Sequence, residues 1–190
     1  MSEKYQFTSD WVTSKIPIWS VHLLPLAGRV LRCLEIGTHE GRSTVWFAES
    51  LLGNPSSRLM CVDPDQSEEA LARWHHNVEA TGRASQITLY RQRSQTLLPQ
   101  LNQQFDLIYV DGDHHGAAVI ADACNSWRLL NHDGILIFDD YQWTWPDYAA
   151  HELPGPAIDY FLSLYHQELV ILEMGYQVIV RKIAKCVEPE

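Results

Sequence analysis

One stretch constrains the fold of this chain more than any other: residues 31–44, with the sequence LRCLEIGTHEGRST. Its apolar run reaches an acid, Glu35, which predicts a buried parallel strand with a carboxylate at its carboxyl end. Gly37 and Gly41 then allow the backbone to turn tightly and to approach a ligand closely, and the residues after them predict a helix. Residues 31–44 therefore predict a strand–turn–helix unit with a ligand site at the turn.

The same alternation of strand and helix is predicted along most of the chain. Apolar runs predict further strands at residues 58–63, 86–90, 105–111, 134–140, 169–172 and 176–180. This order predicts an α/β fold, a Rossmann-like doubly wound and mostly parallel seven-stranded sheet that ends in an antiparallel hairpin. We expect a single domain over residues 1–190, with residues 1–28 as an N-terminal helical cap and residues 141–157 as an aromatic substrate loop.

The composition narrows the function. With 190 residues, of which 46% are hydrophobic, the chain is long enough for one domain with a substantial core. A formal charge of −10 argues against a nucleic-acid partner, because binding a phosphate backbone needs a basic surface. The four cysteines are widely spaced and no stretch is apolar enough for a membrane span, so we expect reduced thiols, a cytoplasmic location and no membrane partner. A small-molecule substrate is the default expectation, and a homo-oligomer is left open.

The glycine turn lacks the motifs of the common nucleotide sites. It has neither G-x-G-x-x-G nor a Gly-Lys-Ser/Thr ending, which disfavours a nicotinamide-dependent oxidoreductase or a P-loop enzyme. A carboxylate at Glu35 would repel a pyrophosphate but suits a cationic or hydroxyl-bearing ligand. The stretch resembles the first motif of class I methyltransferases dependent on S-adenosylmethionine, in which the acid and the glycines hold the methionine part of the cofactor. Asp63, after the second strand, is positioned to accept hydrogen bonds from both hydroxyls of a ribose.

Further acids follow the fourth and fifth predicted strands: Asp111, Asp113, Asp139 and Asp140. If these strands are neighbours, their ends lie about 5 Å apart, which brings Asp111, Asp139 and Asp140 within reach of one ion. Carboxylates so close would repel one another unless a cation lay between them, and an all-oxygen set suits Mg²⁺ better than Zn²⁺. The alternative is that Asp139 and Asp140 cap the long loop while Asp111 contacts the cofactor.

A closer resemblance rests on two short motifs, VDGDH at residues 110–114 and FDDY at residues 138–141. They resemble those of catechol O-methyltransferase and, more closely, of bacterial macrolide-sugar O-methyltransferases. The resemblance covers about residues 31–141 and implies the strand order 3-2-1-4-5-7-6, with S-adenosylmethionine and Mg²⁺ or another divalent cation as cofactors. It implies cofactor contacts by Glu35, Gly37, Thr38, Gly41, Ser43, Asp63, Ser94, Gln95 and Asp111, of which Ser94 and Gln95 lie near the adenine base. It also implies metal ligation by Asp111, Asp139 and Asp140.

The expected reaction is methyl transfer to a hydroxyl of a small molecule such as a sugar, a phenol or another natural product. The sulfonium methyl is already electrophilic, so the protein must align the oxygen and help to remove its proton. The resemblance to the sugar-modifying enzymes implies the second acid of VDGDH, Asp113, as the first choice of base. His114 is the second choice, because the unperturbed pKa of an imidazole lies near neutrality. The lysine base of catechol enzymes has no counterpart here. A metal-independent N- or C-methyltransferase and a non-catalytic S-adenosylmethionine-binding module remain alternatives.

The acceptor itself is not identified by the sequence. Trp143, Trp145 and Tyr148 of the long loop, together with Trp11 and Trp19, could form a flat aromatic wall for a ring. The same residues could equally well be core packing.

Overall fold

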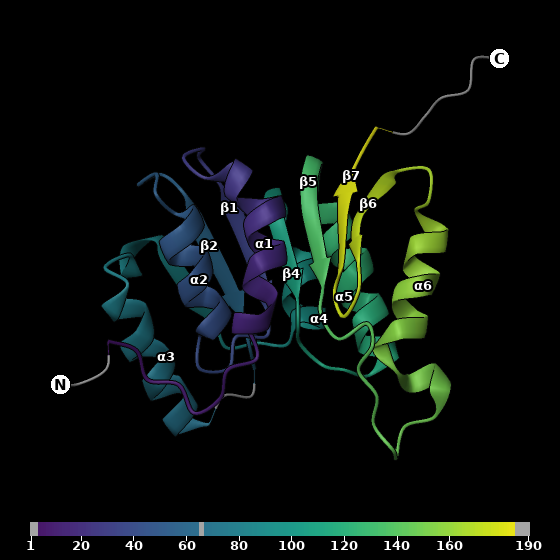
Figure 1. The fold of residues 1–190 in the computed structure, drawn as a ribbon, viewed down its shortest axis with the longest axis horizontal. Coiled ribbons are helices and arrows are strands. Elements are labelled where there is room, and N and C mark those ends of the chain that lie inside the picture. The colour runs from purple at the N-terminus through teal and green to yellow at the C-terminus, as the bar shows by residue number, and fades with distance from the viewer. Residues whose placement is uncertain (1–3, 65–66, 185–190) are drawn as a thin grey trace. The chain divides into compact units, whose positions relative to one another are not determined.

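A computed structural model describes residues 4–64 and 67–184 (Figure 1). Its α-helices are α1 (Ile16–Leu23), α2 (Arg42–Leu51), α3 (Glu68–Ala80), α4 (Ser94–Leu97), α5 (Gly116–Leu129) and α6 (Pro154–Leu164). Its strands are β1 (Arg32–Ile36), β2 (Arg58–Val62), β3 (Ile87–Tyr90), β4 (Phe105–Val110), β5 (Leu130–Phe138), β6 (Leu169–Met174) and β7 (Val178–Lys182). Short 3-10 helices are η1 (Thr13–Lys15), η2 (Leu24–Leu26), η3 (Ala84–Gln86), η4 (Leu98–Gln100) and η5 (Ala150–Glu152).

The strands form one sheet in the order β3-β2-β1-β4-β5-β7-β6. β7 pairs antiparallel with both β5 and β6, whereas β1, β2 and β3 pair in parallel, as do β4 and β5. The predicted strand order and the C-terminal hairpin are therefore confirmed. The chain divides into two compact units, Met1–Arg93 and Ser94–Glu190, which we call unit 1 and unit 2. The single-domain assignment stays a prediction.

Unit 1 places the ends of β1 and β2 side by side. The two strands pair in register from Arg32 opposite Arg58 to Ile36 opposite Val62. α1 buries Trp19 completely, and its indole stacks on Phe47 of α2 at 5.0 Å between ring centroids. Trp19 is therefore part of the core, which excludes it from an aromatic binding wall. Within the segment predicted as a helical cap, one α-helix, α1, is flanked by η1 and η2.

Unit 2 aligns the ends of β4 and β5 in the same way. Val110 lies opposite Phe138 at the end of this parallel pair, and the amide of Asp139 donates to the carbonyl of Val110 at 3.0 Å. α5 and α6 pack together through the edge-to-face rings of Trp127 and Phe161, whose centroids are 5.5 Å apart. The residues directly after β4 and β5 are therefore neighbours, as the sequence predicted.

Several element boundaries in unit 2 differ from the prediction, and two of the differences have a clear local cause. β5 begins at Leu130 rather than at residue 134, because the chain leaves α5 directly into the strand and Leu130 pairs with Phe105. α6 begins at Pro154, inside the segment predicted as loop. A proline is tolerated at the first helical position, where its missing N–H would have had no partner within the helix.

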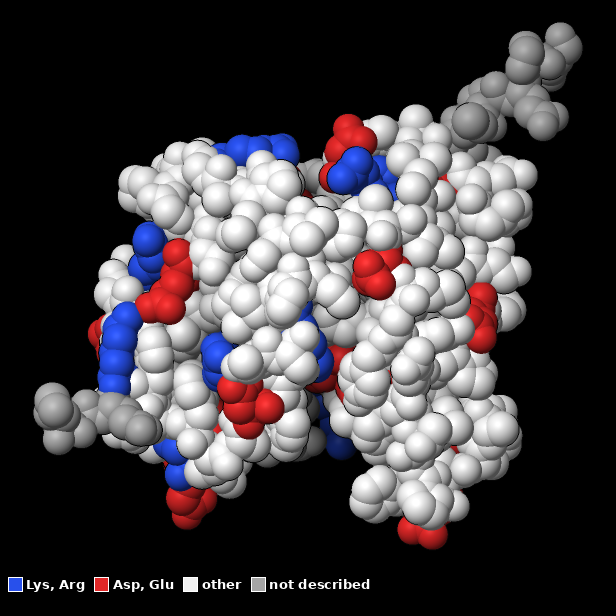
Figure 2. Space-filling view, viewed as in Figure 1, with Lys and Arg blue, Asp and Glu red and all other residues white. Residues whose placement is uncertain are grey.

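Several charged residues of unit 1 form ion pairs. Lys4 contacts Glu49 at 2.6 Å, and Arg73 contacts the buried Glu40 at 2.5 Å. Figure 2 shows several such places where Lys or Arg side chains lie directly beside Asp or Glu. The absence of a nucleic-acid partner stays a prediction.

Three cysteines of the described residues, Cys33, Cys61 and Cys124, are free thiols, and Cys186 lies outside the described residues. Within residues 4–64 and 67–184, no helix combines the length and the apolar character needed to cross a membrane.

Candidate functional site

The turn after β1 has the backbone geometry that its glycines predicted. Gly37 and Gly41 have φ values of 85° and 82°, and His39 between them also lies in the left-handed region with φ 45°. A Cβ added to Gly41 would lie 3.0 Å from Cδ1 of Trp74 on α3. Gly41 is therefore required both by its backbone conformation and by a close neighbour. We call residues 37–41 the glycine turn.

Glu35 lies at the end of β1 but faces the interior of unit 1. Its carboxylate is fully buried and accepts hydrogen bonds from Ser43 Oγ, from Thr44 Oγ1 at 2.6 Å and from Cys61 Sγ at 3.4 Å. Burial raises the pKa of Glu35 to about 7, although the hydrogen bonds from Ser43 and Thr44 lower it. Glu35 and Ser43, both predicted as cofactor contacts, thus bind each other and fasten the first turn of α2 to β1.

Asp63 links the end of β2 to the glycine turn. Its Oδ2 accepts hydrogen bonds from the amides of Thr38 at 2.9 Å and His39 at 3.0 Å. Asp63 and Thr38, predicted separately as cofactor contacts, are therefore brought together with Gly37.

Part of the segment predicted as an N-terminal helical cap also contacts the glycine turn. Residues 4–13, here called the strap, reach Glu40, whose carboxylate accepts from the amide of Thr8 at 2.6 Å and from its hydroxyl at 2.8 Å. Asn77 of α3 donates to the carbonyls of both Gln6 and Glu40. Trp11, predicted for an aromatic wall, lies beside His39, with the two rings tilted by 39° and their centroids 5.4 Å apart. In the sequence, the acid inside the glycine turn, Glu40, was the one indication that another segment would be bound there.

In unit 2, Asp111 follows β4 while Asp139 and Asp140 follow β5. The buried hydroxyl of Tyr109 donates to Asp111 Oδ2 at 2.8 Å and also contacts Asp139 Oδ2. Asp139 Oδ1 accepts from the amide of Asp140 at 2.8 Å, and Asp140 has a left-handed backbone with φ 60°. Burial and the two flanking carboxylates raise the pKa of Tyr109, so its proton is retained.

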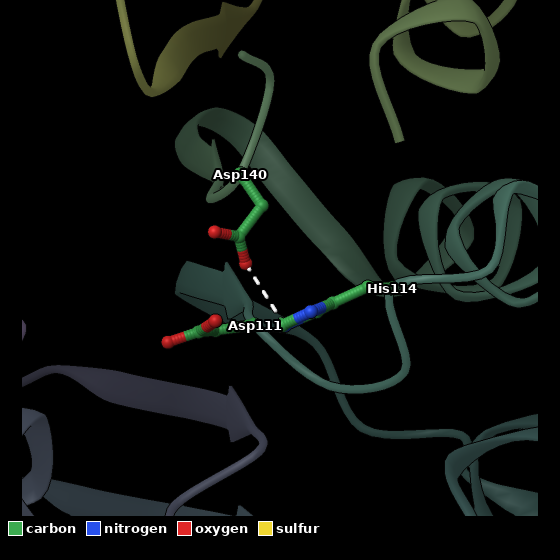
Figure 3. A group of neighbouring side chains, drawn as sticks. All are labelled: Asp111, His114 and Asp140. Carbon is green, nitrogen blue, oxygen red and sulfur yellow. Dashed lines mark ion pairs between the residues drawn. The ribbon is translucent and has the colours of Figure 1, made fainter. Parts of the chain in front are cut away.

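The structure brings His114 into this acidic group (Figure 3). Asp111, His114 and Asp140 each offer one ligand-type atom, and these atoms lie within 4.8 Å of one another. His114 Nε2 is 3.1 Å from Asp140 Oδ2, and Asp140 raises the pKa of His114 while burial opposes the shift. Tyr176 donates to the other Asp140 oxygen at 2.8 Å. The group therefore contains His114, whereas Asp139 of the predicted ligand set faces Tyr109.

The donor set of this group fits a divalent cation. Three carboxylates meet around Tyr109 and His114, an arrangement that a doubly charged ion would stabilise. Carboxylate oxygens alone suit Mg²⁺, whereas an imidazole nitrogen among the ligands favours a transition metal such as Mn²⁺ or Fe²⁺.

Asp113 is held by its own turn. Its Oδ1 accepts from the amide of His115 at 2.9 Å and lies 2.7 Å from His115 Nδ1. Burial raises the pKa of Asp113, but these two contacts outweigh it and leave the pKa below its ordinary value. Asp113 thus stays ionised at neutral pH and remains half-exposed.

A pocket of about 270 Å³ opens beside these residues. Its lining consists of Gly112, Asp113, His114, His115, Trp143, Trp145 and Tyr148. Trp143 stacks parallel to Trp145 at 6.0 Å between ring centroids, and His115 lies against Tyr148 with the rings tilted by 31° and their centroids 4.5 Å apart. Both predicted bases therefore line a pocket with aromatic walls, to which the long loop contributes its predicted residues.

Ser94 and Gln95, the predicted adenine contacts, lie at the start of α4. Both are hydrogen-bonded to Asp122 of α5, Gln95 through its Nε2 at 3.2 Å. Asp122 is almost completely buried, and its position on the inner face of a helix gave no sign of this contact in the sequence.

Comparisons with known proteins identify relatives of this chain. A family model described as a methyltransferase domain matches residues 34–141. The O-methyltransferase hkm8 of Aspergillus hancockii is 30% identical over 115 residues, which is 60% of this chain and 44% of that protein. A catechol O-methyltransferase of Niastella koreensis is 34% identical over 84 residues, 42% of this chain and 36% of that protein. The chain thus spans less than half the length of these two curated relatives.

Among solved structures, the O-methyltransferase from Bacillus cereus in complex with SAH has a similar fold. It aligns with a TM-score of 0.72 and 18% identity over 93% of this chain and 84% of that one. At that identity the likeness concerns the fold. Because the family model covers more than half of the sequence, this chain belongs to the methyltransferase domain family.

Proposed function

We propose that this chain is an S-adenosylmethionine-dependent O-methyltransferase that acts on a hydroxyl of a small molecule and uses a divalent cation. The observation that supports this most strongly is the acidic group of Asp111, His114 and Asp140 together with the aromatic pocket that His114 also lines. An oxygen nucleophile needs a nearby cation or base to lose its proton, and a ring-bearing acceptor suits aromatic walls.

The glycine turn of unit 1 supports the cofactor assignment. Bound S-adenosylmethionine would supply an electrophilic methyl group. Gly37 and Gly41 allow a close approach of the backbone, and Asp63 fixes the turn through two amides. Glu35 is proposed to act through Ser43, because it accepts a hydrogen bond from Ser43 and so orients the start of α2. The cofactor contacts proposed for unit 2 are Asp111, Ser94 and Gln95.

The cation would be held by Asp111 and Asp140, with His114 or Asp139 as a further ligand. A divalent ion held there would lower the pKa of the acceptor hydroxyl. Mg²⁺ is the proposed ion if only carboxylates ligate, and Mn²⁺ or a similar ion if His114 does. His114 could ligate only as neutral imidazole, whereas Asp140 raises the pKa of His114 and so favours the protonated form.

Asp113 is the proposed base. It is ionised, lines the pocket and can share an accepted proton with His115, which it already contacts at 2.7 Å. His114 is the second candidate, because it lines the same pocket but is engaged with Asp140.

The acceptor is proposed to be a sugar, a phenol or another hydroxylated natural product. A net charge of −10 favours a small molecule over a nucleic acid. A cytoplasmic location is part of the same proposal.

The decisive experiment is a screen of hydroxylated compounds with S-adenosylmethionine that carries a tritium-labelled methyl group, with and without a chelator. Methyl transfer that the chelator abolishes, and that Mg²⁺ or Mn²⁺ restores, is the expected result. Asp140→Asn should weaken metal binding by calorimetry, whereas Asp133→Asn, an exposed acid of the same unit, should not. If the chain binds neither S-adenosylhomocysteine nor a divalent ion, the proposal is overturned.

One observation favours a second candidate, a metal-independent methyltransferase acting on nitrogen or carbon. Asp140 lies 3.1 Å from His114 and raises its pKa, which favours the protonated form, and a protonated His114 could serve where a metal would otherwise be needed. Methyl transfer that is unaffected by the chelator would select this candidate.

A further inference from the structure

A buried acid of unit 2 has no part in the reaction proposed above. Asp122 on α5 is 1% exposed, and its hydrogen-bonding neighbours are Ser94 and Gln95 at the start of α4. Within residues 4–64 and 67–184, no Lys, Arg or His forms an ion pair with it. A buried carboxylate without a cation is costly, so its place beside two proposed cofactor residues calls for an explanation.

The protonation state of Asp122 determines how Gln95 is oriented. Burial raises the pKa of Asp122 to about 6, against the hydrogen bond from Ser94, so the group is mainly ionised at neutral pH. An ionised carboxylate can only accept hydrogen bonds. Gln95 must therefore turn its NH₂ group toward Asp122, as the 3.2 Å contact from Nε2 to Oδ1 indicates.

This orientation leaves the Gln95 carbonyl available to a ligand. Gln95 is exposed, and its Oε1 has no hydrogen-bond partner among the described residues. Ser94 is buried and hydrogen-bonded to the same carboxylate, so α4 is anchored beside Gln95 at a second point. The chain thus presents a fixed hydrogen-bond acceptor.

Building on the proposed function, in which Ser94 and Gln95 contact the base of the cofactor, we infer that Asp122 is a positioning residue that makes the site select a 6-amino purine. A carbonyl oxygen accepts a hydrogen bond from an amino group and repels another carbonyl oxygen. The site should therefore prefer adenine, which carries an amino group at position 6, to hypoxanthine, which carries an oxygen there.

The test compares the affinities of S-adenosylhomocysteine and S-inosylhomocysteine by calorimetry at about pH 7.5. The wild-type chain should bind the adenosyl ligand about tenfold more tightly, the scale of one hydrogen bond replaced by a repulsive contact. Asp122→Asn should bring this ratio close to one, because an Asn side chain can offer either an oxygen or an NH₂ group and no longer fixes Gln95. A purely structural role for Asp122 would weaken both ligands equally and leave the ratio unchanged.

Two further variants complete the experiment. Gln95→Ala removes the carbonyl itself and should also bring the ratio close to one, even if Asp122→Asn fails to fold. Gln100→Ala, an exposed glutamine of η4 that donates to the carbonyl of Thr96, is the matched control and should keep the wild-type ratio.

The outcomes separate the two proposals. The inference is overturned if the wild-type chain binds both ligands tightly with an affinity ratio near one. It is also overturned if Asp122→Asn or Gln95→Ala keeps the affinity ratio of the wild-type chain. Either result would leave the methyltransferase proposal intact. Failure of the wild-type chain to bind S-adenosylhomocysteine would overturn the proposed function itself and the inference with it.

Discussion

Replacing Glu35 by glutamine should change how the stability of this protein depends on pH. Glu35 is fully buried, and its pKa is raised from the ordinary 4.5 to about 7, chiefly by burial. The folded state therefore holds a proton that the unfolded chain releases between these two values. The stabilisation by protonated Glu35 is present in full below pH 4.5 and is lost as the pH rises to about 7.

The size of the effect follows from the two pKa values. Each unit of difference corresponds to about 1.4 kcal/mol, so between about pH 5 and pH 8 Glu35 should remove about 2.5 kcal/mol from the free energy of unfolding. The glutamine of the variant cannot titrate, and its amide can still bond to the hydroxyls of Ser43 and Thr44. The difference in stability between Glu35→Gln and the wild-type chain should therefore shift by about 2.5 kcal/mol in favour of the variant over this range.

Urea unfolding followed by tryptophan fluorescence at about pH 5, pH 6.5 and pH 8 measures this difference. Glu79→Gln, at an exposed position of α3, is the matched control, because its carboxylate stays in water in both states. The free energy of unfolding of Glu79→Gln should differ from that of the wild-type chain by the same amount at every pH. If the difference in unfolding free energy between Glu35→Gln and the wild-type chain is also constant with pH, Glu35 does not hold a proton in the folded state and the reasoning is refuted.

Three other predictions concern the turns and the acidic group. Gly41→Ala should lower the free energy of unfolding by roughly 1–2 kcal/mol or more in urea titrations, because φ is 82° and a neighbouring ring is 3.0 Å from the added Cβ. Gly28→Ala, with φ 84° and nothing within 4 Å of the added Cβ, should show the backbone cost alone. Equal losses of unfolding free energy in the two variants would contradict the role of the contact. Asp140→Asn should lower the pKa of His114, measured by NMR titration of its ring protons, since Asp140 is the main cause of the raised value; an unchanged pKa would mean that the pair does not persist in solution. Asp113→Asn should abolish turnover while S-adenosylhomocysteine still binds, and near-normal turnover would remove Asp113 as the base.

Most of the sheet could be predicted because its strands are short apolar runs that end in acids or glycines. Their order came from a resemblance, and the pairing of Val110 with Phe138 then placed Asp111 and Asp139 side by side. Local patterns were less informative at helix ends, where Pro154 begins a helix and Leu130 continues directly into a strand. Such boundaries depend on packing between elements, which no short window of sequence contains.

The candidate site was only partly predictable for the same reason. His114 joins Asp140 because the turn after β4 and the left-handed backbone at Asp140 bring the two side chains together, and neither conformation follows from residue type. Trp19 and Trp143 have the same side chain, yet one is in the core and the other lines a pocket. The contact of Asp122 with Gln95 joins residues from two helices and leaves no periodic signal.

The strap has a practical consequence for protein engineering. Thr8 and Trp11 hold the glycine turn from one side, through Glu40 and His39, while Asp63 holds it from β2. A shortened chain that starts after Thr13, or a fusion partner attached within residues 4–13, would release one of these two supports. Such chains would be a poor choice for ligand screening, because a failure to detect binding would result from the lost support of the glycine turn rather than from the choice of compound.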